Sequence, residues 1–299
     1  MKKIIRKSLI DLAHRLEVGA KRLRSAADKA VPEKRIFLHD CEAQGWRNLR
    51  PCFVLSTGRS GTRLLNDLLL LSEDALPEHE SRQELYRPSR RAYEDIEQHP
   101  EIYREVFKSA REEYLLKAAQ QEKVYIETNN QCTFFAPVMR DIFPHAVFIH
   151  LVRHPGDFVR SGIRRKWYTG AHSHDIGRIV PVTGEMKDRW AELSLIEKNG
   201  WLWNETNRFI EDFRRTVPAE AFLFVKAEAL FRDPAVTREI FDFLRIGGYH
   251  EKTVRKVIGT PVNVQKKGHF PAYRDWPEAD KTKLKKVAPR AAAYHYDLD

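Results

Sequence analysis

Short apolar runs alternate with longer stretches of mixed polarity along most of this chain. The runs that predict buried strands are 52–55, 124–127, 146–152 and 222–225. Each is rich in branched or aromatic residues and is bounded by polar ones, as expected of strands buried in a parallel sheet. Because helical patterns separate these runs, the chain predicts an α/β fold: a mostly parallel central sheet flanked by helices, in a single domain with insertions.

The stretches between the strands carry apolar positions at helical spacing. The helices that we expect are one from about Thr62, 91–121, 134–142, 155–165, a long helix with Trp190, Trp201 and Trp203, one from Pro234 to Gly247, and one after residue 277. Pro155 suits the first turn of a helix, where its missing N–H is not needed. The polar stretch 72–89 is expected to be irregular, and 167–184 to be an insertion.

The first predicted strand leads into a loop of small polar residues and cations, Gly58-Arg59-Ser60-Gly61-Thr62-Arg63. Its two glycines let backbone N–H groups turn toward a bound anion, and the helix that follows adds the positive end of its dipole. Two arginines add further positive charge. The loop is therefore predicted to bind a phosphate-like group.

What this loop lacks narrows the type of anion. A nucleoside-triphosphate P-loop has a lysine directly after its last glycine, where it reaches the outer phosphates. Thr62-Arg63 follows the last glycine here. A dinucleotide-binding G-x-G-x-x-G pattern also fails, because no third glycine follows.

A second candidate anion site follows the strongest predicted strand, 146–152. Arg153 stands at the end of that strand, and Ser161 lies on the next helix. An arginine fork and a hydroxyl make a good clamp for a terminal phosphate, since both donate hydrogen bonds and the arginine keeps its charge. Ligands of parallel sheets bind beyond the carboxyl ends of the strands, so we expect Arg153 and the 58–62 loop to lie close together.

These two motifs, in this order, resemble those of the sulfotransferases that use 3′-phosphoadenosine 5′-phosphosulfate (PAPS). The 58–63 loop is similar to their P-loop-like 5′-phosphosulfate loop, and Arg153 with Ser161 is similar to their 3′-phosphate site. The segment 224–234 resembles the family's V-R-Y-E-D-L-x-x-x-P stretch. Lys267-Gly268 resembles the late loop that closes over the nucleotide.

The resemblance runs from about Cys52 to the end of the chain and is closer to the carbohydrate and tyrosyl-protein branch than to the branch that sulfates small phenols. It implies transfer of a sulfuryl group from PAPS to a hydroxyl or amine, which leaves adenosine 3′,5′-bisphosphate, and it implies no metal. The expected acceptor is a carbohydrate or glycolipid, with a tyrosyl-protein substrate as the alternative. Two other classes stay open: a degenerate P-loop nucleotide kinase and a non-enzymatic polyanion-binding module.

The resemblance also implies roles for single residues. The backbone N–H groups of Ser60, Gly61 and Thr62 are expected to hold the 5′-phosphosulfate, and Arg59 to sit at the bridging oxygen. Gly58 and Arg63 complete this set.

The expected catalytic base is Glu80, because His79-Glu80-Ser81-Arg82 resembles a stretch of tyrosyl-protein sulfotransferases whose second carboxylate takes the proton. His79 is the alternative base, since imidazole titrates near neutrality.

The chain departs from the family pattern in two places. Relatives often carry a lysine where this chain has Thr128, so either Arg59 and Arg63 supply that charge or Glu127 and Asn129 serve the acceptor. The tyrosine of V-R-Y-E-D-L is replaced by Ala227, which puts adenine stacking at that position in doubt.

The 299 residues include 52 Lys and Arg against 42 Asp and Glu, a formal net charge of +10. This excess suits a polyanionic ligand. Nucleic acid or an anionic membrane would suit the same charge, but the motifs favour a nucleotide, so we expect no nucleic-acid partner. The cysteines, Cys41, Cys52 and Cys132, show no C-x-x-C spacing and are expected to be free thiols in a reducing compartment.

We divide the chain into 1–50, a basic amphipathic helix with its lead-in, and 51–299, the sulfotransferase domain with acceptor-facing insertions at about 72–121 and 166–186. Packing of the N-terminal helix on the domain or on a partner subunit is favoured over peripheral membrane contact through 1–30. No stretch has the length of a membrane span or the apolar core of a secretory signal, so we expect a cytoplasmic protein, peripheral at the inner membrane surface if that helix binds lipid. Oligomeric state is not indicated.

The insertion also contains His172-x-His174-Asp175, a pattern that zinc can use. Further ligands at a suitable spacing are missing, so we expect contact with the acceptor or plain surface there. Arg164, Arg165, Trp167 and Tyr168 are predicted to face the acceptor as a lid.

Overall fold

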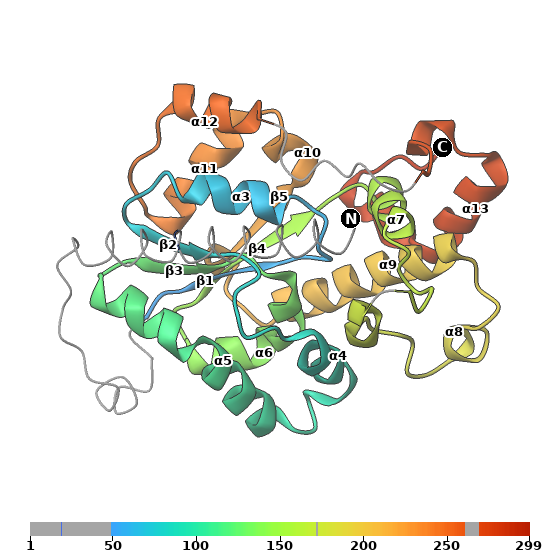
Figure 1. Cartoon of the computed structure of the whole chain (residues 1–299), viewed down its shortest axis with the longest axis horizontal. Helices are drawn as coiled ribbons and strands as arrows, with labels where there is room; N and C mark the ends of the chain where they lie inside the picture. Colours follow the sequence, from blue (N-terminus) through green and yellow to red (C-terminus); the bar gives the residue numbers. More distant parts are fainter. Residues whose placement is uncertain (1–18, 20–48, 172, 261–268) are drawn as a thin grey trace, which may run out of the picture.

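The computed structural model describes residues 19, 49–171, 173–260 and 269–299. At its centre lies a sheet of five parallel strands in the order β2-β3-β1-β4-β5 (Figure 1). The strands are β1 (Cys52–Leu55), β2 (Ala75–Glu78), β3 (Val124–Glu127), β4 (Val147–Val152) and β5 (Phe222–Lys226). The predicted α/β fold with a mostly parallel sheet is confirmed.

Some predictions lie outside the described residues. These are the helix within 1–30, Cys41, His172, Lys267 and Gly268. Cys52 and Cys132 are described, and both are buried free thiols as predicted. Burial raises the pKa of each thiol well above its usual range. Within the described part of the chain, no helix combines the length and apolar character needed to span a bilayer.

The edge strand β2 lies in the stretch 72–89 that the sequence predicts to be irregular. Its sequence contains Pro77, which an edge strand tolerates because one side of its ladder has no neighbour. β2 pairs with β3 in parallel, with Glu78 opposite Glu127, and the N–H of Thr128 donates to the Glu78 carbonyl at 2.9 Å. The residues after β2 are thereby placed beside the end of β3.

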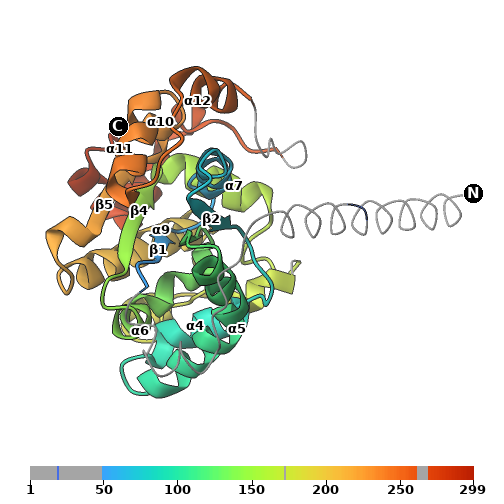
Figure 2. The same cartoon turned by 90° about the vertical axis from the view of Figure 1, so that its left-hand side faces the viewer.

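Helices cover both faces of the sheet (Figure 1, Figure 2). They are α3 (Thr62–Leu69), α4 (Tyr86–Asp95), α5 (Pro100–Gln120), α6 (Ala136–Ile142), α7 (Pro155–Arg164), α8 (Glu185–Asp188), α9 (Leu195–Arg214), α10 (Ala227–Leu230), α11 (Pro234–Leu244), α12 (Glu251–Ile258) and α13 (Glu278–Val287). The predicted stretch 91–121 is two helices, because Pro100 starts a new one. α12 was not predicted, and Trp190 precedes α9 rather than lying in it.

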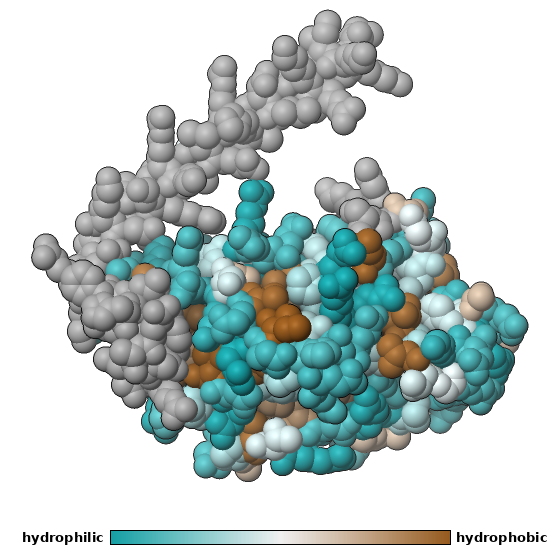
Figure 3. All heavy atoms as spheres, turned by 90° about the horizontal axis from the view of Figure 1, so that it is seen from below, coloured by the Kyte–Doolittle hydropathy of each residue, from teal (hydrophilic) through white to brown (hydrophobic). Residues whose placement is uncertain are grey.

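Alternate side chains of β1 enter two separate hydrophobic cores. Phe53 and Leu55 pack with residues of α5, α6 and α9, whereas Cys52 and Val54 pack with α3 and α10 to α12. All four are buried, which explains the uninterrupted apolar run in the sequence. The face shown in Figure 3 is mostly hydrophilic, with apolar residues in small separate patches.

Short 3₁₀ segments connect several elements. These are η1 (Asn130–Phe135), η2 (Ser173–Gly177), η3 (Ala219–Ala221), η4 (Tyr273–Asp275) and η5 (Pro289–Tyr294). η1 directly follows β3, and the Thr133 hydroxyl in it donates to the Ser56 carbonyl at 3.0 Å, which ties the end of β1 to this segment.

Candidate functional site

A cavity of about 400 Å³ opens beyond the carboxyl ends of β1 and β4. Its lining combines the 58–62 loop and α3, the end of β2, the β4–α7 turn and α7, and the region of α10 and α12. The charged residues in that lining are Arg59, Arg63, Glu80, Arg153, Asp157, Arg160, Arg164 and Arg165. Among the described residues, six arginines therefore face two carboxylates, and the cavity is strongly positive.

The 58–62 loop takes a backbone path that needs its glycines. Gly58 and Gly61 have φ angles of +73° and +96°, in the region that side chains disfavour. A Cβ on Gly61 would lie 2.5 Å from the ring of Phe231. Gly61 is the N-cap of α3, so the unpaired N–H groups of the first helical turn begin at this loop. Ser60 is fully buried, and its Oγ has no hydrogen-bond partner among the residues that the structure describes.

Arg153 lies directly against this loop. Its Nη1 donates to the carbonyl of Arg59 at 3.1 Å, and its Nη2 donates to Asp157 Oδ2 at 3.2 Å. Its Nε is buried and has no hydrogen-bond partner in the described part of the chain. β1 and β4 are neighbours with Leu55 opposite His150, which explains why the two chain segments meet. The predicted proximity of Arg153 to the 58–62 loop is thus confirmed.

Ser161 joins this group from α7. Its Oγ accepts from Arg59 Nε at 3.4 Å and from Arg165 Nη1 at 2.8 Å. The sequence singled out Ser161 and Arg59 but not Arg160, which also lines the cavity and whose Nε donates to the Phe270 carbonyl at 3.0 Å. The position of Arg160 directly before Ser161 could have indicated in the sequence that it belongs to the site.

Burial, and then the crowding of cations, lowers the pKa of two of these arginines. The pKa of Arg165 falls to about 10, first because of burial and then because of Arg59, Arg164, Arg153 and Arg178. The pKa of Arg59 is also lowered, by burial and by Arg153. A bound polyanion would relieve this repulsion, so these groups favour an anionic ligand.

The two candidate bases follow β2 and line the same cavity. His79 has only 9% of its side chain exposed, whereas Glu80 has 63% exposed and a φ of +52°. His79 Nε2 lies 4.0 Å from Glu80 Oε1, and His79 Nδ1 lies 3.0 Å from Thr128 Oγ1. The pKa of His79 is lowered, mainly by burial, while the Glu80 carboxylate opposes that shift.

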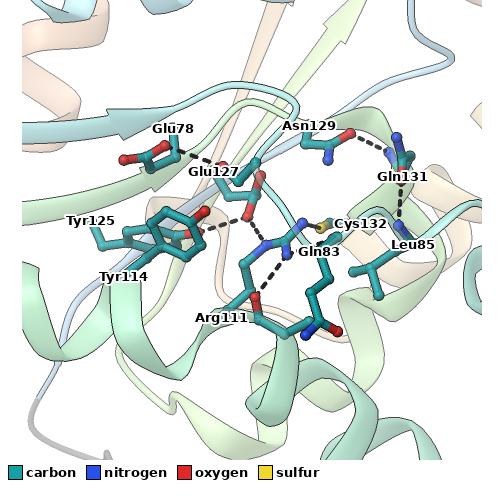
Figure 4. A network of polar contacts seen from close by, with 12 residues as sticks. Glu78, Gln83, Leu85, Arg111, Tyr114, Tyr125, Glu127, Asn129, Gln131 and Cys132 are labelled. Carbon is teal, nitrogen blue, oxygen red and sulfur yellow. Dashed lines mark hydrogen bonds and ion pairs between the residues drawn. The ribbon is translucent and has the colours of Figure 1, made fainter. Parts of the chain in front are cut away.

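Glu127 points toward Arg111 and Tyr125 (Figure 4). It is fully buried, accepts a hydrogen bond from Tyr125 at 2.7 Å and forms an ion pair with Arg111, which is also fully buried. Burial raises the pKa of Glu127, and Arg111 opposes that shift. The alternative that Glu127 serves the acceptor is therefore wrong: it holds a structural ion pair in the core.

The cavity contains an aromatic residue close in sequence to Ala227. Ala227 is fully buried at the start of α10. Phe231, one turn further, lines the cavity, and the guanidinium carbon of Arg153 lies 5.7 Å from its ring centroid. Sequence reasoning missed Phe231 because it lies outside the matched position.

The insertion borders a second, smaller cavity of about 70 Å³ that shares Asn130 with the first. Arg178 and Ile179 line it, and nearby the rings of His174 and Tyr86 stack at 4.2 Å. Trp167 is buried beneath Arg178 rather than exposed to an acceptor. No cluster of three or more potential metal ligands occurs among residues that the structure describes.

Comparisons with known proteins identify a family and similar folds. A family model described as "Sulfotransferase family" matches residues 51–251. Among solved structures, the sulfotransferase domain from the curacin biosynthetic pathway is 16% identical with a TM-score of 0.53, and the match covers 85% of this chain and 100% of that one. It shares the fold.

Two further structures are similar at lower scores. The sulfotransferase domain of the Synechococcus PCC 7002 olefin synthase is 24% identical over 85% of this chain and 97% of that one, with a TM-score of 0.48. A sulfotransferase from Alicyclobacillus acidocaldarius is 16% identical over 83% and 97%, with a TM-score of 0.49. A search of curated protein sequences found no match.

Proposed function

This chain belongs to the sulfotransferase family, and we propose that it transfers a sulfuryl group from PAPS to a hydroxyl or amine of an acceptor. The observation that carries the choice of donor is the contact between Arg153 and the 58–62 loop, through the Arg59 carbonyl at 3.1 Å. One cavity thus contains both a helix N-terminus for a phosphosulfate and a guanidinium for a second phosphate.

Two buried polar atoms support a ligand with two anionic ends. Ser60 Oγ, in the loop, and Arg153 Nε, at the other motif, both lack partners in the described part of the molecule. Buried polar groups without partners are costly, so each points to a group that the ligand would supply. In this proposal Ser60, Gly61 and Thr62 bind the 5′-phosphosulfate, and Arg153 with Ser161 binds the 3′-phosphate.

The remaining lining residues would act on charge and on the adenine. Arg59 lies in the loop and Arg63 directly follows it, and Arg59 would neutralise the charge that grows on the leaving oxygen. Phe231 offers an aromatic face near Arg153, and we propose that it stacks on the adenine in place of the tyrosine replaced by Ala227. Lys267 and Gly268 are proposed to close over the nucleotide.

The acceptor is proposed from the resemblance alone: a carbohydrate or glycolipid, with a tyrosyl-protein substrate as the alternative. The segments 72–121 and 166–186 are proposed to select it. The smaller cavity beside Asn130 supports this placement, because residues of both segments line it.

The test is transfer of labelled sulfate from PAPS into a panel of glycans, lipids and proteins. We expect labelled product, formation of adenosine 3′,5′-bisphosphate, and no transfer from ATP with magnesium. Phosphate transfer from ATP would favour the kinase alternative, and absence of any transfer with unchanged polyanion binding would favour a binding module.

A further inference from the structure

We infer that the hydroxyl of Thr128 holds His79 in the tautomer that carries its proton on Nδ1, so that Nε2 accepts the proton in sulfuryl transfer. Thr128 is then a positioning residue, and His79 rather than Glu80 is the base. The role as base rests on the proposed function, whereas the tautomer does not depend on it.

The tautomer follows from counting protons. Thr128 Oγ1 has one proton, and it lies 3.0 Å from the Glu78 carbonyl, which can only accept. It also lies 3.4 Å from Asn66 Oδ1, so two oxygen acceptors surround it. With its proton donated to one of them, the hydroxyl oxygen has lone pairs left for His79, 3.0 Å away. The ring must then donate from Nδ1.

The surroundings of the other ring nitrogen, Nε2, are consistent with this tautomer. Nε2 lies 4.0 Å from Glu80 Oε1, too far for an Nε2–H to donate a hydrogen bond to that carboxylate. Both side chains line the cavity. In the tautomer with its proton on Nδ1, Nε2 has a lone pair, and His79 lines the cavity where an acceptor hydroxyl would lie.

Burial keeps the imidazole of His79 neutral, against the effect of the nearby carboxylates. Burial lowers its pKa, and Arg63 on α3 lowers it further, whereas Glu80, Asp67 and a hydrogen bond with the Thr128 backbone raise it. The net shift is downward, so the ring is neutral near pH 7. Glu80 is far more exposed than His79, with 63% of its side chain exposed against 9%.

In the proposed sulfuryl transfer, His79 takes the acceptor proton. The acceptor oxygen forms a bond to sulfur, and the bond from sulfur to the bridging oxygen of the phosphosulfate breaks. That electron pair goes to the leaving phosphate of adenosine 3′,5′-bisphosphate. The acceptor proton goes to Nε2 of His79, which becomes an imidazolium and later releases the proton to solvent.

The direct test is ¹⁵N NMR of the full chain with labelled histidines at pH 7.5, with His79 assigned from its loss in His79→Gln. We expect a protonated Nδ1 and an unprotonated Nε2 in the wild type and in Thr128→Ser, and a mixture of tautomers in Thr128→Val. A wild-type His79 protonated on Nε2 would overturn the inference, whether or not sulfate transfer is found.

Kinetics give the second readout. Thr128→Val should lower kcat roughly tenfold or more while the affinity for adenosine 3′,5′-bisphosphate stays the same, and Thr128→Ser should restore most of the loss. A Thr128→Val variant with wild-type kcat, or a Thr128→Ser variant as impaired as Thr128→Val, contradicts a role for the hydroxyl.

Discussion

The hydroxyl of Tyr296 donates a hydrogen bond to Glu228 Oε2 at 2.7 Å, and Glu228 Oε1 accepts from the N–H of His154 at 2.8 Å. His154 directly follows Arg153. The last residues of the chain therefore help to hold the turn that positions Arg153, which is proposed to bind the 3′-phosphate. The His154 ring adds to this link, because its Nε2 lies 3.1 Å from the Asp297 carbonyl.

Tyr296→Phe should weaken binding of adenosine 3′,5′-bisphosphate severalfold, because the carboxylate loses the donor that fixes it. Loss of a hydrogen bond to a charged group also costs about 1.5–3 kcal/mol of unfolding free energy. Titration calorimetry and urea unfolding measure the two effects. Tyr249→Phe is the matched control, since its hydroxyl donates at 3.2 Å to the Pro234 carbonyl elsewhere. Equal affinity in the two variants would contradict the link.

Gly61→Ala should lower nucleotide affinity more than tenfold. Its φ of +96° and the nearby Phe231 ring leave no space for a methyl group, so the loop must shift. Gly184→Ala serves as control, because Gly184 also has a positive φ, +77°, but nothing lies within 4 Å of its added Cβ. If both variants bind the nucleotide equally, the prediction that a methyl group at residue 61 displaces the loop is wrong.

Arg111→Met should destabilise the fold by about 3–5 kcal/mol, because it leaves the buried Glu127 carboxylate without its cation. Arg111→Met combined with Glu127→Gln should recover part of that loss. Urea unfolding of the single and double variants measures the difference. A double variant that is no more stable than Arg111→Met would show that the unpaired charge is not the cause.

The pH dependence of kcat/KM should have one acid limb, at a pH below the usual histidine pKa. Activity falls as pH drops through the lowered pKa of His79, since the imidazolium cannot accept a proton. Glu80→Gln removes a charge that raises this pKa, so the limb should move to lower pH. Arg63→Ala removes a charge that lowers it, so the limb should move to higher pH. Complete loss of activity in Glu80→Gln would instead make Glu80 the base.

Strands formed by continuous apolar runs could be predicted from the sequence, whereas contacts between strands could not. β1 is apolar throughout because both of its faces are buried. β2 was missed because Pro77 and Glu78 belong to no such run, and only an edge position tolerates them. α12 was missed because Val254 is its one buried residue, which leaves a weak apolar signal.

The site, too, could be predicted only in part. Gly61 and Arg153 could be placed together because both follow strands of a parallel sheet. The contact between His79 and Thr128 could not be predicted, since it depends on the register that sets Glu78 opposite Glu127.

Binding of adenosine 3′,5′-bisphosphate shows whether one ligand joins the 58–62 loop to Arg153. We expect calorimetry to show that the wild type prefers this nucleotide to adenosine 5′-monophosphate. Arg153→Ala should remove the preference, at a cost of roughly 1.5–3 kcal/mol, or more than tenfold in affinity. Arg104→Ala, which loses only an exposed ion pair with Asp141, should bind like the wild type. Equal affinity of the wild type for both nucleotides, or an Arg153→Ala variant that keeps the preference, would contradict the account.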